Sequence, residues 1–197
     1  MISTNTILKK FSYKEMVASL AEFMAANFED FSADQVRFYK TISILENEIK
    51  DATAPSVGEV VEAIDRQIGS SLLFSFFLGF KANLDHFNDP IGRTFLDVDS
   101  ETYLRESVAK RLPDFQNAQL VLEGFYASLS PAQQVLYEDV ITYISHLETV
   151  GPKLAHYYGY MLGNQLYPRI IPGYSEDLHL TSQYQLMLEN YLGVSIK

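Results

Sequence analysis

Cysteine and tryptophan are both absent from the 197 residues of this chain. Without cysteine there is no disulfide, thiol nucleophile, zinc ribbon or iron–sulfur centre. The absence also suits a reducing compartment, and we expect a cytoplasmic protein. The first residues, MISTNTILKKF, include no apolar stretch long enough for a signal peptide, so we do not expect secretion by the usual route.

Basic residues are scarce. The chain has 15 Lys and Arg against 25 Asp and Glu, which gives a formal net charge of -10. Nucleic-acid binding depends on Lys and Arg that neutralise phosphates, so we expect no direct contact with nucleic acid. The carboxylates are spread along the chain instead of forming dense runs, a pattern typical of a solvated surface.

A long hydrophobic run is missing as well. The most apolar stretch, residues 72–80, lies between Gln67 and Lys81 and is shorter than the roughly 20 residues of a membrane span. We therefore expect no membrane segment and interpret this stretch as protein core. Gly69 and Gly79 each predict a bend or a close helix crossing, because glycine inside a helix costs up to about 1 kcal/mol relative to alanine. Leucine at either position should destabilise the fold.

Apolar and aromatic residues are abundant, with 47% hydrophobic residues, 13 Phe and 13 Tyr, so the chain should fold without a cofactor. The central element is a buried helix predicted over 57–87, introduced by the Ser-x-x-Glu capping box of Ser56 and Glu59. Ser130, Pro131 and Gln133 mark a second clear helix start.

Helical periodicity recurs along the rest of the chain, whereas no strand pattern of comparable strength occurs. We expect an all-α, single-domain multi-helix bundle over 1–197 with about seven or eight helices. It includes a long C-terminal helix over 131–166, kinked or broken near Pro152, in which Gly159 and Gly163 allow close packing. The other predicted helices cover 13–27, 32–50, 100–111, 114–128 and 181–192, and the loops cover 88–99 and 167–178.

The first candidate site lies where the central helix is expected to end, at His86 and Asp89. Imidazole and carboxylate groups there are possible metal ligands. An EF-hand starting at Asp97 fails, however, because its sixth and twelfth positions are Thr102 and Val108. Asp and Asn that cap a helix end are the more common reason for such a group, and we predict no metal site.

The second candidate site consists of His156, Tyr157 and Tyr160 in the long C-terminal helix. The zinc-protease pattern His-Glu-x-x-His is absent, and His146 stands about 15 Å of helical rise away from His156. Tyr and His in such a stretch are most often core or interface residues with one bonded polar tip. The alternative is an aromatic pocket for a small ligand.

The familiar catalytic templates are missing from the sequence. It has no Gly-x-Ser-x-Gly elbow and no phosphate-binding Gly-Lys-Ser/Thr loop. Glu176 stands three residues before His179, but this is a single Glu-x-x-His, and a di-iron bundle needs two. The sequence therefore favours a protein without a cofactor that is not an enzyme.

The leading functional hypothesis is an acidic protein–protein interaction module whose Tyr-rich surface and negative charge contact another protein, or a second copy of itself. One alternative is an enzyme or small-molecule binder that uses the two candidate sites. Another is an inhibitor from a phage or other mobile element that presents acidic helices to a host nuclease.

Overall fold

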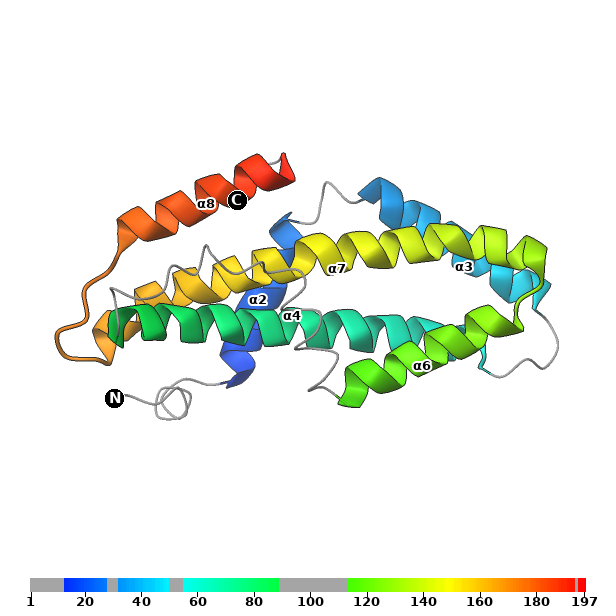
Figure 1. Cartoon of the computed structure of the whole chain (residues 1–197), viewed down its shortest axis with the longest axis horizontal. Coiled ribbons are helices and arrows are strands. Elements are labelled where there is room, and N and C mark those ends of the chain that lie inside the picture. Colours follow the sequence, from blue (N-terminus) through cyan, green and yellow to red (C-terminus); the bar gives the residue numbers. More distant parts are fainter. Residues whose placement is uncertain (1–12, 28–31, 50–54, 89–112, 194) are drawn as a thin grey trace. The chain divides into compact units, whose positions relative to one another are not determined.

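The chain is all-α in the computed structural model, which describes residues 13–27, 32–49, 55–88, 113–193 and 195–197. These residues form six α-helices and one short 3-10 helix, and no strand (Figure 1). The helices are α2 (Tyr13–Asn27), α3 (Ser32–Glu48), α4 (Val57–Asn88), α6 (Pro113–Ser128), α7 (Pro131–Leu166), η3 (Tyr167–Arg169) and α8 (Leu178–Leu192). The predicted fold class is confirmed for the described part of the chain.

The predicted number of seven or eight helices is not matched. The predicted helix at 100–111 lies outside the described residues, and so does the predicted loop at 88–99 apart from Asn88, which ends α4. The C-terminal helix also does not break at Pro152, because α7 continues as one helix of 36 residues.

Burial explains why α7 runs through Pro152. Proline inside a helix removes a hydrogen bond and crowds the preceding turn, at a cost of about 3 kcal/mol. Val150 and Leu154, one turn apart on either side of Pro152, are both buried, and Pro152 itself is buried with them. The apolar stripe of the helix therefore continues across the proline, and packing outweighs its local cost.

Capping residues set the helix starts. The Ser56 N–H donates to Glu59 Oε2 at 2.7 Å, and the Glu59 N–H donates to Ser56 Oγ at 3.3 Å. Ser130 and Gln133 make the same reciprocal pair at 3.0 and 3.4 Å, so both predicted capping boxes are confirmed.

The last helix begins earlier than predicted. The side chain of Asp177 accepts a hydrogen bond from the Leu180 N–H at 3.0 Å, so α8 starts at Leu178 instead of 181. Its predicted end is correct, because Gly193 adopts a left-handed conformation with φ of 71°. The predicted loop at 167–178 is accordingly shorter, and its first three residues form η3.

The chain divides into two compact units. The first comprises Met1–Asn27, Leu72–Leu104 and Val150–Lys197, and the second comprises Phe28–Ser71 and Arg105–Thr149. Both α4 and α7 belong partly to each unit, so the division does not follow the sequence. The single domain expected over 1–197 stays a prediction.

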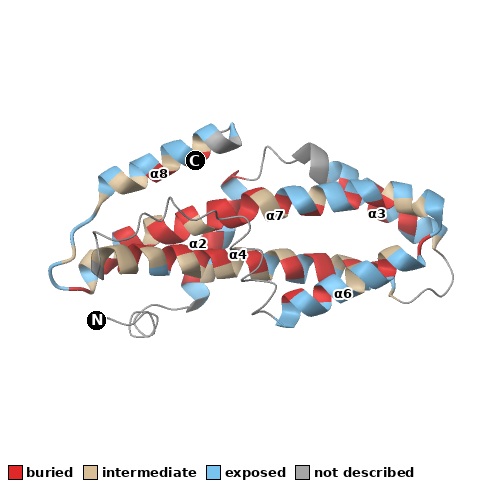
Figure 2. Ribbon diagram, viewed as in Figure 1, coloured by how far each residue is buried: buried red, intermediate tan, exposed pale blue. Residues whose placement is uncertain are grey.

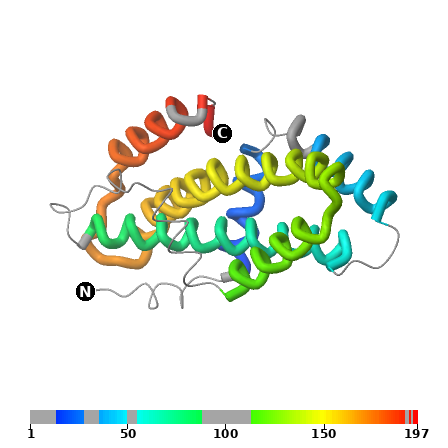
Figure 3. The backbone as a smooth tube through the Cα atoms, turned by 45° about the vertical axis from the view of Figure 1, so that its right-hand side comes forward, coloured from blue at the N-terminus to red at the C-terminus, as the bar shows by residue number. Residues whose placement is uncertain are grey.

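The core of the second unit combines residues of α3, α4, α6 and α7. Leu45, Val60, Phe125 and Val140 are fully buried there. Within this unit α6 and α7 are joined by a short turn and diverge from it, as Figures 1 and 3 both show.

The core of the first unit contains the apolar part of α4. No residue from Leu72 to Phe80 is exposed, and Phe76 and Phe80 are fully buried, so the interpretation of this stretch as protein core is confirmed (Figure 2). A Cβ atom added to Gly79 would lie 1.9 Å from the His156 carbonyl oxygen, and one on Gly159 would lie 2.0 Å from that of Phe76. The close helix crossing predicted from these glycines is confirmed.

Of the bend or close crossing predicted at Gly69, the close crossing is wrong. Its position is exposed, and a Cβ atom there would meet nothing within 4 Å. Gly69 therefore marks no close crossing.

None of the described helices combines the length and the apolar character that crossing a lipid bilayer requires.

Candidate functional site

The predicted residues of α7 gather around a residue that the sequence did not single out. His156 Nδ1 lies 2.7 Å from the hydroxyl oxygen of Tyr184 in α8. The ring centroids of Tyr157 and Tyr160 lie 5.4 and 6.1 Å from that of Tyr184. Tyr184 was missed because 28 residues of sequence separate it from His156.

These side chains are held by internal contacts. The Tyr157 hydroxyl donates to Gln185 Oε1 at 3.1 Å, so α7 and α8 are joined at two neighbouring positions. Tyr157, Tyr160 and Tyr184 are all buried. A ligand-binding role for His156, Tyr157 and Tyr160 stays a prediction, whereas their role in attaching α8 is visible in the structure.

Burial also sets the protonation of this cluster. Desolvation lowers the pKa of His156 to about 4, although part of its side chain reaches the surface. Burial, followed by the charge of Asp177, raises the pKa of Tyr160 to about 12. Burial also raises the pKa of Tyr184. All three side chains are therefore neutral near pH 7. A general base, by contrast, works best when its pKa is close to 7.

The other predicted site is only partly described, since Asp89 lies outside the described residues. His86 belongs to the last turn of α4, and its Nε2 lies 3.7 Å from Asp177 Oδ2. Asp177 also caps α8, so His86 contacts the residue that starts this helix. Among the described residues, no group of three His, Asp or Glu side chains is placed to hold a metal ion.

A polar network fixes the segment between α7 and α8. The Tyr174 hydroxyl donates to Asn83 Oδ1, and Asn164 Oδ1 accepts the Asp177 N–H at 2.9 Å. Asn164 Nδ2 donates to Thr181 Oγ1 at 3.2 Å. The segment and the start of α8 are therefore bonded to both α4 and α7.

The Tyr-rich surface expected from the sequence is not found among the described residues. Among the tyrosines whose burial is described, Tyr39 alone is exposed. The others are buried or half-buried because their rings fill the core while several hydroxyls reach hydrogen-bond partners.

The outward side of α8 is a second feature that the sequence analysis missed. Leu178, Leu186 and Met187 are 63%, 58% and 40% exposed. We call this surface the α8 face. Its other exposed residues are His179, Ser182, Gln183 and Asn190. None of these seven is Lys, Arg, Asp or Glu, whereas charged residues make up 20% of the chain.

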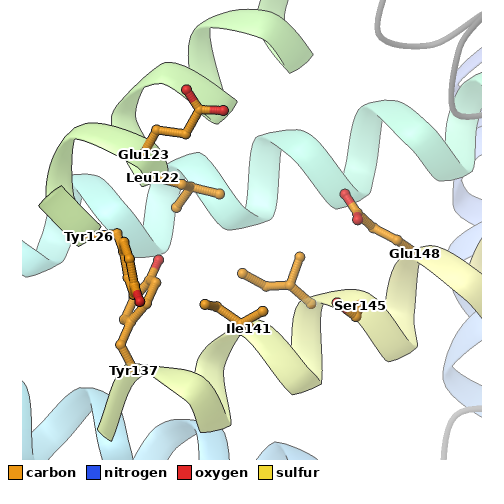
Figure 4. A pocket seen from close by; sticks show the side chains of 8 residues that line it. Leu122, Glu123, Tyr126, Tyr137, Ile141, Ser145 and Glu148 are labelled. Carbon is orange, nitrogen blue, oxygen red and sulfur yellow. The ribbon is translucent and has the colours of Figure 1, made fainter. Parts of the chain in front are cut away.

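The third feature is a pocket in the second unit, between α6 and α7. It has a volume of about 310 Å³ and is lined by Leu122, Glu123, Tyr126, Tyr137, Ile141, Ile144, Ser145 and Glu148 (Figure 4). The sequence gave no signal for it, because its lining residues have the ordinary spacing of helix-packing positions.

Comparison with known proteins provides no relative from which a function transfers, since no family model, no curated protein and no solved structure matches this chain.

Proposed function

We propose that this chain is a non-enzymatic protein-binding module that contacts a basic partner protein through the α8 face. The observation that carries the proposal is the composition of that face: Leu178, Leu186 and Met187 are exposed, and none of the seven residues of the face is charged. Protein interfaces are depleted of charge at their centre and enriched in Met and aromatic residues. Apolar side chains grouped on one exposed face are a common mark of interaction sites.

The attachment of α8 supports this proposal. Tyr184 and Leu188 are buried beneath the α8 face, and Tyr184 and Gln185 are hydrogen-bonded to α7. The face is therefore presented by a helix that is held in place. A preorganised surface loses less conformational entropy on binding than a loose one.

The net charge decides between possible partners. The chain carries a formal charge of -10, so a second copy brings like charge, whereas a basic protein brings opposite charge. Complementary charge accelerates encounter and excludes like-charged partners. The apolar α8 face then supplies the buried contact itself.

A capture experiment with matched variants tests the proposal. Tagged wild type is compared with the double variant Leu186→Lys, Met187→Lys and with the control Leu120→Lys, which alters a 67% exposed leucine of α6. Lysine suits a helix, and near the C-terminal end of α8 it also suits the helix dipole, so the fold should persist.

We expect a stoichiometric basic protein to be captured by wild type and by Leu120→Lys and to be lost from the double variant. The same protein captured equally by all three would contradict the proposal, and so would capture of only a second copy of this chain.

A further inference from the structure

The pocket between α6 and α7 has the size and lining of a small-molecule site. Its volume of about 310 Å³ lies at the lower end of the range of roughly 300–1,000 Å³ that such sites occupy. Leu122 of α6 and Ile141 and Ile144 of α7 supply apolar walls. Figure 4 shows Tyr126 and Tyr137 side by side at one end and Glu148 at the other.

The charge of the lining selects the class of ligand. Of the eight described lining residues, Glu123 and Glu148 are acidic and none is basic. Carboxylates beside apolar walls attract a cation more strongly than they do in open water, and they repel an anion. A ligand for this pocket should be positively charged at one end and apolar elsewhere.

Polar groups at the Glu148 end support a ligand with N–H donors. The amide nitrogen of Gln67 donates to Glu148 Oε1. Gln67 is only 6% exposed, and its Oε1 atom is buried with no hydrogen-bond partner in the described part of the chain. The Glu148 carboxylate is therefore held by a buried amide, and an incoming ammonium would bring further donors to it.

The opposite end of the pocket offers aromatic surface. The ring centroids of Tyr126 and Tyr137 lie 5.9 Å apart with a 45° angle between the ring planes. Tyr137 is 2% exposed, and its buried hydroxyl has no hydrogen-bond partner within the described ranges. At this end the aromatic rings favour an apolar or cationic neighbour.

We propose that this pocket binds a small organic cation with an apolar body, an alkyl- or arylammonium compound. The ammonium group pairs with Glu148, and the apolar body lies between Leu122 and Ile141, against the tyrosine rings. This site uses no residue of the α8 face, so it is independent of the proposed protein contact.

Three probes of matched shape test the ligand class by calorimetric titration of the full chain. They are 2-naphthylmethylammonium, the neutral 2-naphthylmethanol and the anionic 2-naphthoate. We expect saturable binding of the cation, about tenfold weaker binding of the alcohol, since one partly buried ion pair is lost, and no binding of the anion.

Two variants and a control test the location. Glu148→Gln keeps the side-chain shape and should reduce affinity for the cation about tenfold, with little change for the alcohol. Glu138→Gln removes an equal charge from an exposed position of the same helix, outside the pocket lining, and should leave affinity unchanged. Ile141→Trp should abolish binding of both probes, because the larger side chain fills the pocket and Ile141 is exposed enough to accept it.

The proposal is overturned if the three probes bind equally or not at all. It is also overturned if Glu138→Gln weakens binding of the cation as much as Glu148→Gln does, because a general effect of net charge would then explain the result.

Discussion

At the scale of single residues, the buried tyrosines differ in what their hydroxyl groups contact. The Tyr167 hydroxyl donates to the Phe80 carbonyl oxygen at 2.7 Å in the core of the first unit. The Tyr137 hydroxyl in the second unit has no such partner among the described residues, and burial raises its pKa to about 12. The two residues therefore form a matched pair for measuring what a buried hydroxyl contributes to stability.

Substitution by phenylalanine should affect these two tyrosines in opposite directions. Tyr167→Phe removes a buried hydrogen bond to the Phe80 carbonyl, which keeps its bond within α4, and should lower the free energy of unfolding by about 1 kcal/mol. Tyr137→Phe removes an unsatisfied group and should leave that free energy unchanged or raise it by about 1 kcal/mol. Urea denaturation measures both values, and a loss above about 1 kcal/mol in Tyr137→Phe would refute the assignment.

His156 should make the fold sensitive to acid. Its pKa falls from 6.5 to about 4 on burial, so below about pH 6.5 the unfolded state binds a proton that the folded state does not. The stabilisation is complete above pH 6.5 and is lost as the pH falls to about 4, by at most roughly 3 kcal/mol.

His156→Gln isolates this contribution from the carboxylates, which titrate in both proteins. The difference in unfolding free energy between wild type and variant, measured from pH 7 to pH 4, should decrease as the pH falls. A difference that is independent of pH would show that His156 titrates normally in the folded state.

At the scale of helices, the close approach of α4 and α7 in the first unit depends on two glycines. The Cβ atoms missing from Gly79 and Gly159 would lie 1.9 and 2.0 Å from carbonyl oxygens of the facing helix. Real Cβ atoms essentially never come this close, so any side chain there forces the backbones apart.

Alanine scanning of the helix glycines should therefore separate two classes. Gly79→Ala and Gly159→Ala should each destabilise the protein by several kcal/mol or prevent folding, because strained packing typically costs about 1–3 kcal/mol even without a backbone clash. Gly69→Ala meets open space inside α4 and should stabilise by up to about 1 kcal/mol. Melting temperatures measure all three, and equal effects at Gly69 and Gly79 would contradict the crossing.

Local sequence signals predicted much of the helical framework. The capping boxes at Ser56 and Ser130 mark helix starts through contacts three residues apart, and such short-range chemistry is readable from sequence. Of the kink or break expected at Pro152, the break was wrong because packing around α7 opposes the local cost of proline.

The features on which the two proposals rest were harder to predict. Tyr184 contacts His156 across 28 residues of sequence, and the pocket is lined by residues of two helices, α6 and α7. The α8 face depends on which side of an amphipathic helix is covered, which tertiary packing decides.

At the scale of the whole molecule, net charge and the α8 face act at different stages of the proposed contact. The net charge of -10 attracts a basic partner through long-range electrostatic forces, which salt screens. The apolar α8 face acts only once the two proteins are in contact. The association rate of the captured partner should therefore fall as salt rises, while its dissociation rate changes little. Surface plasmon resonance at low and high salt measures both rates, and a salt effect confined to dissociation would contradict this division.

The most direct test of the central claim is the heat-capacity change when the captured partner binds, measured by titration calorimetry at several temperatures. Burial of the apolar α8 face predicts a negative heat-capacity change for wild type and for Leu120→Lys, and no measurable binding by the double variant Leu186→Lys, Met187→Lys. A heat-capacity change near zero, with equal affinity in all three proteins, would show that the acidic surface alone makes the contact and that α8 is not the binding face.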